Sequence, residues 1–155
     1  MKLPILKNLL SYEDIKPSLE YLPRQGTLIK TNTGLVCLDI DDNYIHQLFP
    51  FIDYTGASKP NYFAGAKNTG AHISLFYADE LATLTSPIAE IGKSYSFAVA
   101  GIFSTAIASK MYYAIAVEAP GLTALREQYG FNPQLNFKGY AMNLHITIGT
   151  KQAIK

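Results

Sequence analysis

The stretch His145-Ile146-Thr147-Ile148 decides the fold, because the same order of residue types occurs earlier in the chain as His72-Ile73-Ser74-Leu75. Each stretch has a histidine, an apolar residue, a hydroxyl residue and a second apolar residue. Alternate side chains of a β-strand lie on the same face, so each stretch predicts a strand with imidazole and hydroxyl together and apolar residues in the core. Two of the chain's three histidines carry this pattern, which makes coincidence a poor explanation.

The sequence around the two motifs predicts one structural unit that occurs twice. The first unit is a strand at 35–40, a helix within 42–52, a long loop and the motif strand. The second unit is a strand at 111–118, a helix that follows a Pro-Gly pair, a loop and the motif strand at 144–150. If the two units pair about a pseudo-twofold axis, both motif strands are expected to line one cleft.

Turn residues and side-chain alternation place the element boundaries. Residues 26–40 predict a hairpin whose turn contains Gly34, since glycine readily adopts a positive φ. Pro50 is expected to end or kink the first helix, and Gly130 to end the second in a left-handed cap. Residues 94–103 alternate large and small side chains, as does the strand that follows, which predicts two antiparallel strands of one sheet.

Length and composition predict one compact domain. The 155 residues lie within the usual size of a domain, about 100 to 200 residues. Hydrophobic residues make up 48% of the chain and charged residues 16%, which argues against a disordered chain. We therefore predict a single α+β domain over 1–155, with approximate lobes at 35–80 and 111–150.

The charge balance restricts the possible partners. Lysine and arginine number 13 against 12 acidic residues, giving a net charge of +1, and the only arginines are Arg24 and Arg126. Gripping a long nucleic acid requires many neutralised phosphates at once, so no long nucleic acid partner is expected. The longest uncharged run, 94–109, is shorter than the roughly 20 apolar residues of a spanning helix, so no membrane partner is expected.

Cys37 is the single cysteine, which excludes an internal disulfide and a site of several cysteines. It lies in an apolar stretch and is expected to be a small buried side chain. The first residues are interrupted by Pro4 and Lys7 and show no secretion signal. A reducing compartment, the cytoplasm, is therefore the expected location.

Two imidazoles and two hydroxyls in one cleft suit phosphoryl transfer without a metal. Histidine titrates near neutrality, so one imidazole can take a proton from an attacking water or hydroxyl while the other gives one to the departing oxygen. The hydroxyls can hold phosphate oxygens. The chemistry therefore points to phosphodiester or cyclic phosphate hydrolysis.

This paired pattern resembles the 2H phosphoesterase superfamily, and the resemblance extends from about Leu35 to Thr150. It implies a two-lobed, pseudo-symmetric α+β fold with antiparallel sheets lining a central groove and helices outside. It also implies a metal-independent phosphodiesterase, with no cofactor, that acts on a small nucleotide, a cyclic oligonucleotide or an RNA end. By motif match, His72 and His145 share the acid and base roles, and Ser74 and Thr147 contact phosphate.

One departure concerns residues 139–143, which lack the proline that many members place just before the second motif histidine. This argues against the RNA-ligase-like branch of the superfamily. The branch of small phage enzymes that destroy cyclic-nucleotide alarm signals, the anti-CBASS phosphodiesterases, matches the chain in size.

Four further residues are candidates for substrate binding. Tyr62 and Tyr140 precede the two motifs and could stack on a nucleobase. Lys67 and Lys138 also precede them and could attract a phosphate. For all four, an ordinary role in a loop is the alternative.

Other readings of the histidine pair are two half-buried imidazoles hydrogen-bonded within a sheet, a metal site, and a non-catalytic nucleotide-binding module that uses the same groove. A metal site is not expected. The motifs offer no His-x-His pair, no nearby carboxylate on the same face and no cysteine partner. The third histidine, His46, is expected at the edge of the first helix.

Overall fold

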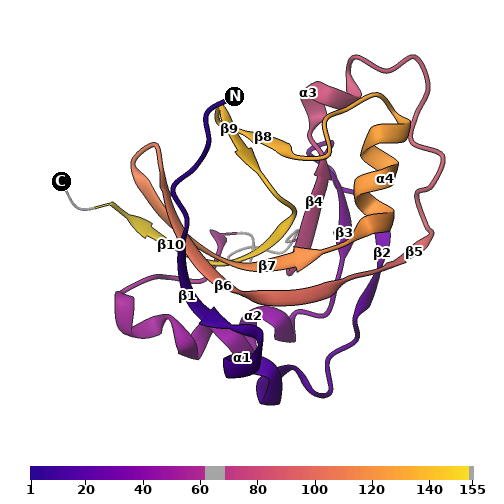
Figure 1. The fold of residues 1–155 in the computed structure, drawn as a ribbon. Coiled ribbons are helices and arrows are strands. Elements are labelled where there is room, and N and C mark those ends of the chain that lie inside the picture. The colour runs from indigo at the N-terminus through magenta and orange to yellow at the C-terminus, as the bar shows by residue number, and fades with distance from the viewer. Residues whose placement is uncertain (62–68, 154–155) are drawn as a thin grey trace.

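The computed structural model describes residues 1–61 and 69–153, whose strands form two four-stranded antiparallel sheets and a separate hairpin (Figure 1). The α+β class with antiparallel sheets and few helices is as predicted. The first sheet has the order β1-β6-β7-β10. Its strands are β1 (Lys7–Ser11), β6 (Ala98–Ile107), β7 (Lys110–Glu118) and β10 (His145–Gln152).

The second sheet has the order β4-β3-β2-β5. The hairpin, formed by β8 and β9, stands apart from both sheets in the hydrogen-bonding pattern. These strands are β2 (Gln25–Lys30), β3 (Val36–Asp39), β4 (His72–Phe76), β5 (Ser94–Ser96), β8 (Leu135–Phe137) and β9 (Tyr140–Met142).

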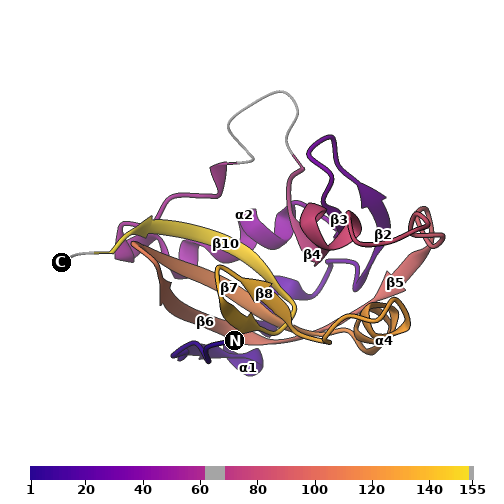
Figure 2. The same ribbon diagram turned by 90° about the horizontal axis from the view of Figure 1, so that it is seen from above.

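The helices are short and lie on the outside of the sheets (Figures 1 and 2). Helices α1 and α2 contact each other and the first sheet, while α4 contacts the second sheet. None of the helices within 1–61 and 69–153 has the length and apolar character needed to cross a membrane. They are α1 (Tyr12–Leu19), α2 (Asn43–Leu48), the 3₁₀ turns η1 (Phe49–Phe51) and η2 (Asp53–Thr55), α3 (Ala78–Leu81) and α4 (Pro120–Gln128).

The predicted turn residues lie where the sequence placed them. Gly34 adopts φ 91° between β2 and β3, which pair antiparallel as a hairpin. Helix α2 ends at Leu48, and Pro50 continues the chain only as a 3₁₀ turn, because proline lacks the amide that an α-helix requires. Gly130 follows α4 with φ 86°. These boundaries are confirmed.

The stretch 94–103, predicted as one strand, is divided between the two sheets, so this part of the prediction is wrong. β5 pairs with β2 of the second sheet, whereas β6 pairs with β7 of the first. Phe97 lies at the division, 5% exposed, with its ring centroid 5.4 Å from that of Tyr44. Alternation continues through the division, so periodicity alone could not show the change of partner.

The N-terminal region forms two elements that the sequence analysis did not anticipate. Strand β1 pairs with β6 at an edge of the first sheet. Helix α1 begins at a capping box, in which the Asp14 amide donates to the Ser11 hydroxyl and the Ser11 amide to the Asp14 carboxylate. The spacing Ser11-x-x-Asp14, with buried Ile15 and Leu19 after it, is the signal that marks this helix.

The core separates the motif side chains from the helices. Ile146 lies between His145 and Thr147 in β10, pairs with Ile115 of β7 and is fully buried. By strand alternation these isoleucines share the face opposite the motif side chains. They belong to one core cluster with Ile15 and other residues of α1 and α2. The helices therefore cover one face of the first sheet and leave the motif face for the site.

Candidate active site

The two motif strands are edge strands that meet at the junction of the sheets. β4 is an edge strand of the second sheet and β10 is an edge strand of the first, and the two strands contact each other. His72 is the first residue of β4, and His145 is the first residue of β10. Figure 2 shows these strands side by side, as the pseudo-twofold arrangement predicts.

A cavity of about 270 Å³ lies at this junction, and all four motif side chains line it. His72 and Ser74 come from β4, and His145 and Thr147 from β10. The structure therefore brings together the imidazoles and hydroxyls that the sequence placed on separate strands. Aromatic and polar side chains complete the wall, among them Tyr77, Thr105, Lys110, Tyr112, Phe137 and Thr150.

Each imidazole is held by the same backbone contact. His72 Nδ1 lies 2.8 Å from the carbonyl oxygen of Gly70, and His145 Nδ1 lies 2.8 Å from that of Asn143. A carbonyl oxygen only accepts, so each Nδ1 carries the proton and donates it. The proposed proton exchange uses the other ring nitrogen, Nε2, which is a base in the neutral ring and an acid in the imidazolium.

Burial lowers the pKa of both histidines from the usual value. For His72, the bond to Gly70 and the charge of Asp39 oppose this effect. For His145, the bond to Asn143 opposes it, but the nearby His72 lowers its pKa further. Proximity and burial together disfavour two imidazolium ions in the cavity at neutral pH.

Tyrosine and phenylalanine rings form one wall of the cavity. The rings of Tyr112 and Phe137 are perpendicular, with centroids 5.2 Å apart. The ammonium of Lys138 donates a hydrogen bond of 3.1 Å to the Tyr112 hydroxyl and lies over both rings. Burial and the charge of Glu80 raise the pKa of Tyr77, which also lines the cavity, to about 12.

The other predicted substrate-binding residues have different positions. Lys138 reaches the cavity wall through Tyr112, as described above. Tyr140 is not among the described residues that line the cavity, and its ring lies beneath the Lys2 ammonium, 5.5 Å from it. Tyr62 and Lys67 lie outside the described residues.

Several wall residues escaped the sequence analysis. Thr105 of β6 and Tyr112 of β7 lie on strands whose large side chains were assigned to the core. The sequence did contain one signal for these residues, a break in the alternation of large and small side chains along the strand. Tyr112 is a large side chain at a position where the alternation of β7 calls for a small one, next to the buried Tyr113.

Both arginines are engaged within the fold. The Arg126 side chain is 1% exposed and donates to both carboxylate oxygens of Glu80, at 2.9 and 2.8 Å. It also donates to the carbonyl oxygens of Leu75, Asn132 and Gln134, which matches the five N–H groups of a guanidinium. Arg24 donates to two backbone carbonyls and a tyrosine hydroxyl.

The remaining chemical candidates lie away from the cavity. Cys37 is fully buried, as predicted, and burial raises its pKa to about 12. His46 is exposed on α2, with Nδ1 2.9 Å from the Lys59 ammonium. Across residues 1–61 and 69–153, no group of three or more His, Cys, Asp or Glu side chains is arranged to hold a metal ion.

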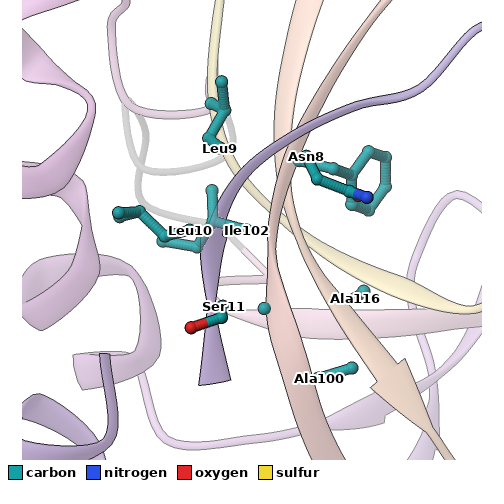
Figure 3. Close-up of a pocket in the computed structure, with 9 residues that line it drawn as sticks. Asn8, Leu9, Leu10, Ser11, Ala100, Ile102 and Ala116 are labelled. Atoms are coloured by element: carbon teal, nitrogen blue, oxygen red, sulfur yellow. The ribbon is translucent and has the colours of Figure 1, made fainter. Parts of the chain in front are cut away.

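A larger hollow, of about 440 Å³, lies where β1 pairs with β6 (Figure 3). Its polar side chains are Asn8 and Ser11, and none of the described residues that line it is ionisable. Gly101 lies here because a Cβ at this position would stand 2.5 Å from the carbonyl oxygen of Leu10. Chemistry rather than size therefore identifies the smaller histidine cavity as the candidate active site.

Comparison with known proteins gives one match. A family model described as "2H-SAK: Swiss Army Knife, 2H phosphoesterase domain" matches residues 36–154. The match contains both motif strands and every motif residue at the cavity. No curated protein and no solved structure matches the chain.

Proposed function

The chain belongs to the 2H phosphoesterase family, and from this membership we propose that it is a metal-independent phosphodiesterase using two-histidine acid/base catalysis. The observation that carries the proposal is the cavity in which His72, Ser74, His145 and Thr147 lie together. Two titratable groups and two hydroxyls are the residues that metal-free phosphoryl transfer needs.

The proposed reaction adds water across one phosphodiester bond. One imidazole accepts a proton at Nε2 from the attacking water as its oxygen bonds to phosphorus. The other imidazole donates a proton to the oxygen that leaves phosphorus. Ser74 and Thr147 donate hydrogen bonds to the non-bridging oxygens, whose negative charge grows in the transition state. Solvent then restores both protonation states.

The proposed substrate is a small nucleotide or a short or cyclic oligonucleotide. The aromatic wall offers faces on which a base can stack, and Lys138 offers one exposed positive charge at that wall. The arginines are engaged in structural bonds, so the cavity binds phosphate through hydroxyls and few cations. Cyclic oligonucleotides, the substrates of the anti-CBASS branch, and RNA ends both fit this description.

A substrate panel in the presence of EDTA tests the proposal. The panel contains 2′,3′-cyclic mononucleotides, 2′-5′ and 3′-5′ dinucleotides, and cyclic di- and trinucleotides, with products identified by mass. We expect turnover of at least one class, undiminished by EDTA. Binding without turnover across the panel would indicate a nucleotide-binding module, and loss of turnover with EDTA would indicate a metal enzyme.

A Lys138 variant tests substrate binding in the same panel. Lys138 has φ 51°, which asparagine tolerates, so Lys138→Asn removes the charge without straining the turn. We expect KM for the best substrate to rise about fivefold with kcat unchanged, since an exposed ion pair contributes up to about 1 kcal/mol. The exposed Lys93→Asn is the matched control. An unchanged KM would remove Lys138 from the substrate contacts.

A further inference from the structure

The two histidines differ in the residue that lies across the sheet from each. Asp39 of β3 is the register partner of His72, whereas Ala116 of β7 is the register partner of His145. Directly opposed side chains share a face, with Cβ atoms about 4.5 to 5.5 Å apart. A carboxylate therefore lies beside the imidazole of β4, and a methyl group lies beside that of β10.

The surroundings of His145 are apolar on a second side as well. The Phe103 ring of β6 contacts the His145 ring edge to face, with centroids 6.3 Å apart and an interplanar angle of 77°. Phe103 is 6% exposed, so it shields the imidazole from water. An apolar environment disfavours the charged ring and so favours neutral His145.

We propose that Asp39 is a positioning residue that favours the proton on His72 over one on His145, so that His72 is the general acid and neutral His145 is the general base. This assignment rests on the proposed function. In the reaction, His145 Nε2 takes the proton of the attacking water. His72 Nε2 gives its proton to the departing oxygen as the bond from that oxygen to phosphorus breaks.

A second carboxylate supports the arrangement around His72. Asp42, at the start of α2, accepts a hydrogen bond of 3.0 Å from the Ala71 amide, and the Gly70 carbonyl oxygen accepts the His72 Nδ1 proton. Asp42 thus fixes the backbone that holds the imidazole. Burial and, after it, the charge of Asp42 raise the pKa of Asp39, and the charge of His72 opposes them.

Among residues 1–61 and 69–153, the other ionisable groups around His72 lie on the cavity wall: His145 of β10, Tyr77 after β4, and Lys110 and Tyr112 of β7. Asp39 raises the pKa of His72 against the effect of burial, and His72 lowers that of His145. Both influences favour a proton on His72 over one on His145, in agreement with the register.

NMR titration of the histidine rings tests the electrostatic part of the proposal without a substrate. The three histidines are assigned with single His→Ala variants. In Asp39→Asn we expect the His72 pKa to fall by about 0.5 to 1 unit, because the stabilising anion is lost. Asp39→Glu keeps the anion and should restore the titration. Asp53→Asn, an exposed turn residue with the same change of charge, is the control. An unchanged His72 pKa in Asp39→Asn overturns the proposal.

The pH profile of kcat/KM tests the role of each histidine. The general acid must be protonated, so activity falls as pH rises through the His72 pKa. Asp39→Asn should therefore move the alkaline limb about 0.5 to 1 unit lower and leave the acidic limb, set by His145, in place. A uniform loss at every pH would indicate a merely structural role and contradict the proposal, as would movement of the acidic limb alone.

A substrate with a good leaving group identifies the acid directly. A nucleoside p-nitrophenyl phosphate releases its phenolate without protonation, so His72→Ala should lose at least tenfold less activity on it than on the best substrate of the panel. His145→Ala should lose similar activity on both. The reverse result would make His145 the acid and overturn the assignment. Absence of wild-type turnover on the panel would instead contradict the proposed function itself.

Discussion

At the scale of single residues, the backbone orients the two imidazoles for the proposed proton transfer. Each Nδ1 proton is committed to a carbonyl oxygen two residues earlier, so the tautomer is fixed before any substrate binds. Ring rotation would break this bond, which keeps Nε2 in a defined direction. The entropy of orienting the two rings is therefore lost during folding, so less entropy is lost when the proposed transition state forms.

Removal of either imidazole should abolish turnover and leave the fold intact. His72→Ala and His145→Ala should each lower kcat/KM by about 10²- to 10⁴-fold, the usual contribution of a general acid or base. Both side chains are only partly buried, so the circular dichroism spectrum should be unchanged. Ser74→Ala and Thr147→Ala, which remove the proposed phosphate donors, should have smaller effects. Near wild-type activity in either histidine variant would contradict two-histidine catalysis.

The sequence was sufficient to identify the motif residues but not the whole cavity wall. Strand alternation places His145 and Thr147 on the same face, because it depends only on residues within one strand. Tyr77 and Phe137 reach the cavity from outside the motif strands, on segments whose approach depends on the packing of the complete chain. The contrast between Asp39 and Ala116 also depends on strand register, which single-strand periodicity does not determine.

At the scale of elements, one buried side chain holds several segments together. Arg126 of α4 bonds to the Leu75 carbonyl in β4, to Glu80 in α3 and to the segment before β8. Glu80 also accepts a hydrogen bond from the Tyr77 amide, next to the motif strand. The second helix of the predicted repeat thus supports the histidine strand of the first.

Replacement of this arginine should destabilise the fold. Arg126→Met keeps much of the apolar stem but removes the charged partner of the Glu80 carboxylate and the side-chain donor to three carbonyl oxygens. We expect the free energy of unfolding, measured with urea, to fall by about 3 kcal/mol. Lys93→Met, which removes one exposed positive charge, should change it by less than about 0.5 kcal/mol. A loss below about 1 kcal/mol in Arg126→Met would contradict this role.

At the scale of the whole molecule, the small net charge and the structural bonds of both arginines limit the positive charge that is available to bind phosphate. The chain carries +1 in total, and its two arginines are bound to carbonyl and carboxylate oxygens within the fold. In the proposed function, phosphate binding is therefore left to local hydroxyls and a few lysines. Such a surface suits a substrate with one or a few phosphates.

The dependence of activity on salt should be correspondingly weak. Each phosphate neutralised on a single strand contributes about −0.7 to the slope of log affinity against log salt concentration. For one or two contacts we expect log kcat/KM to fall with a slope of about −1 between about 50 and 200 mM potassium chloride. A slope of about −4 or steeper would indicate an extended nucleic acid contact and contradict the expectation of a small substrate.

The division of residues 94–107 between β5 and β6 has a consequence for the cooperativity of unfolding. β5 follows the first motif in sequence but completes the second sheet, and β1 precedes that motif but completes the first sheet. Each sheet thus contains an edge strand that is separated in sequence, by strands of the other sheet or by the segment after β4, from the rest of its strands. A cut between β4 and β5 would leave both sheets without an edge strand. Protection against hydrogen exchange should therefore be lost in both sheets together, in one cooperative opening.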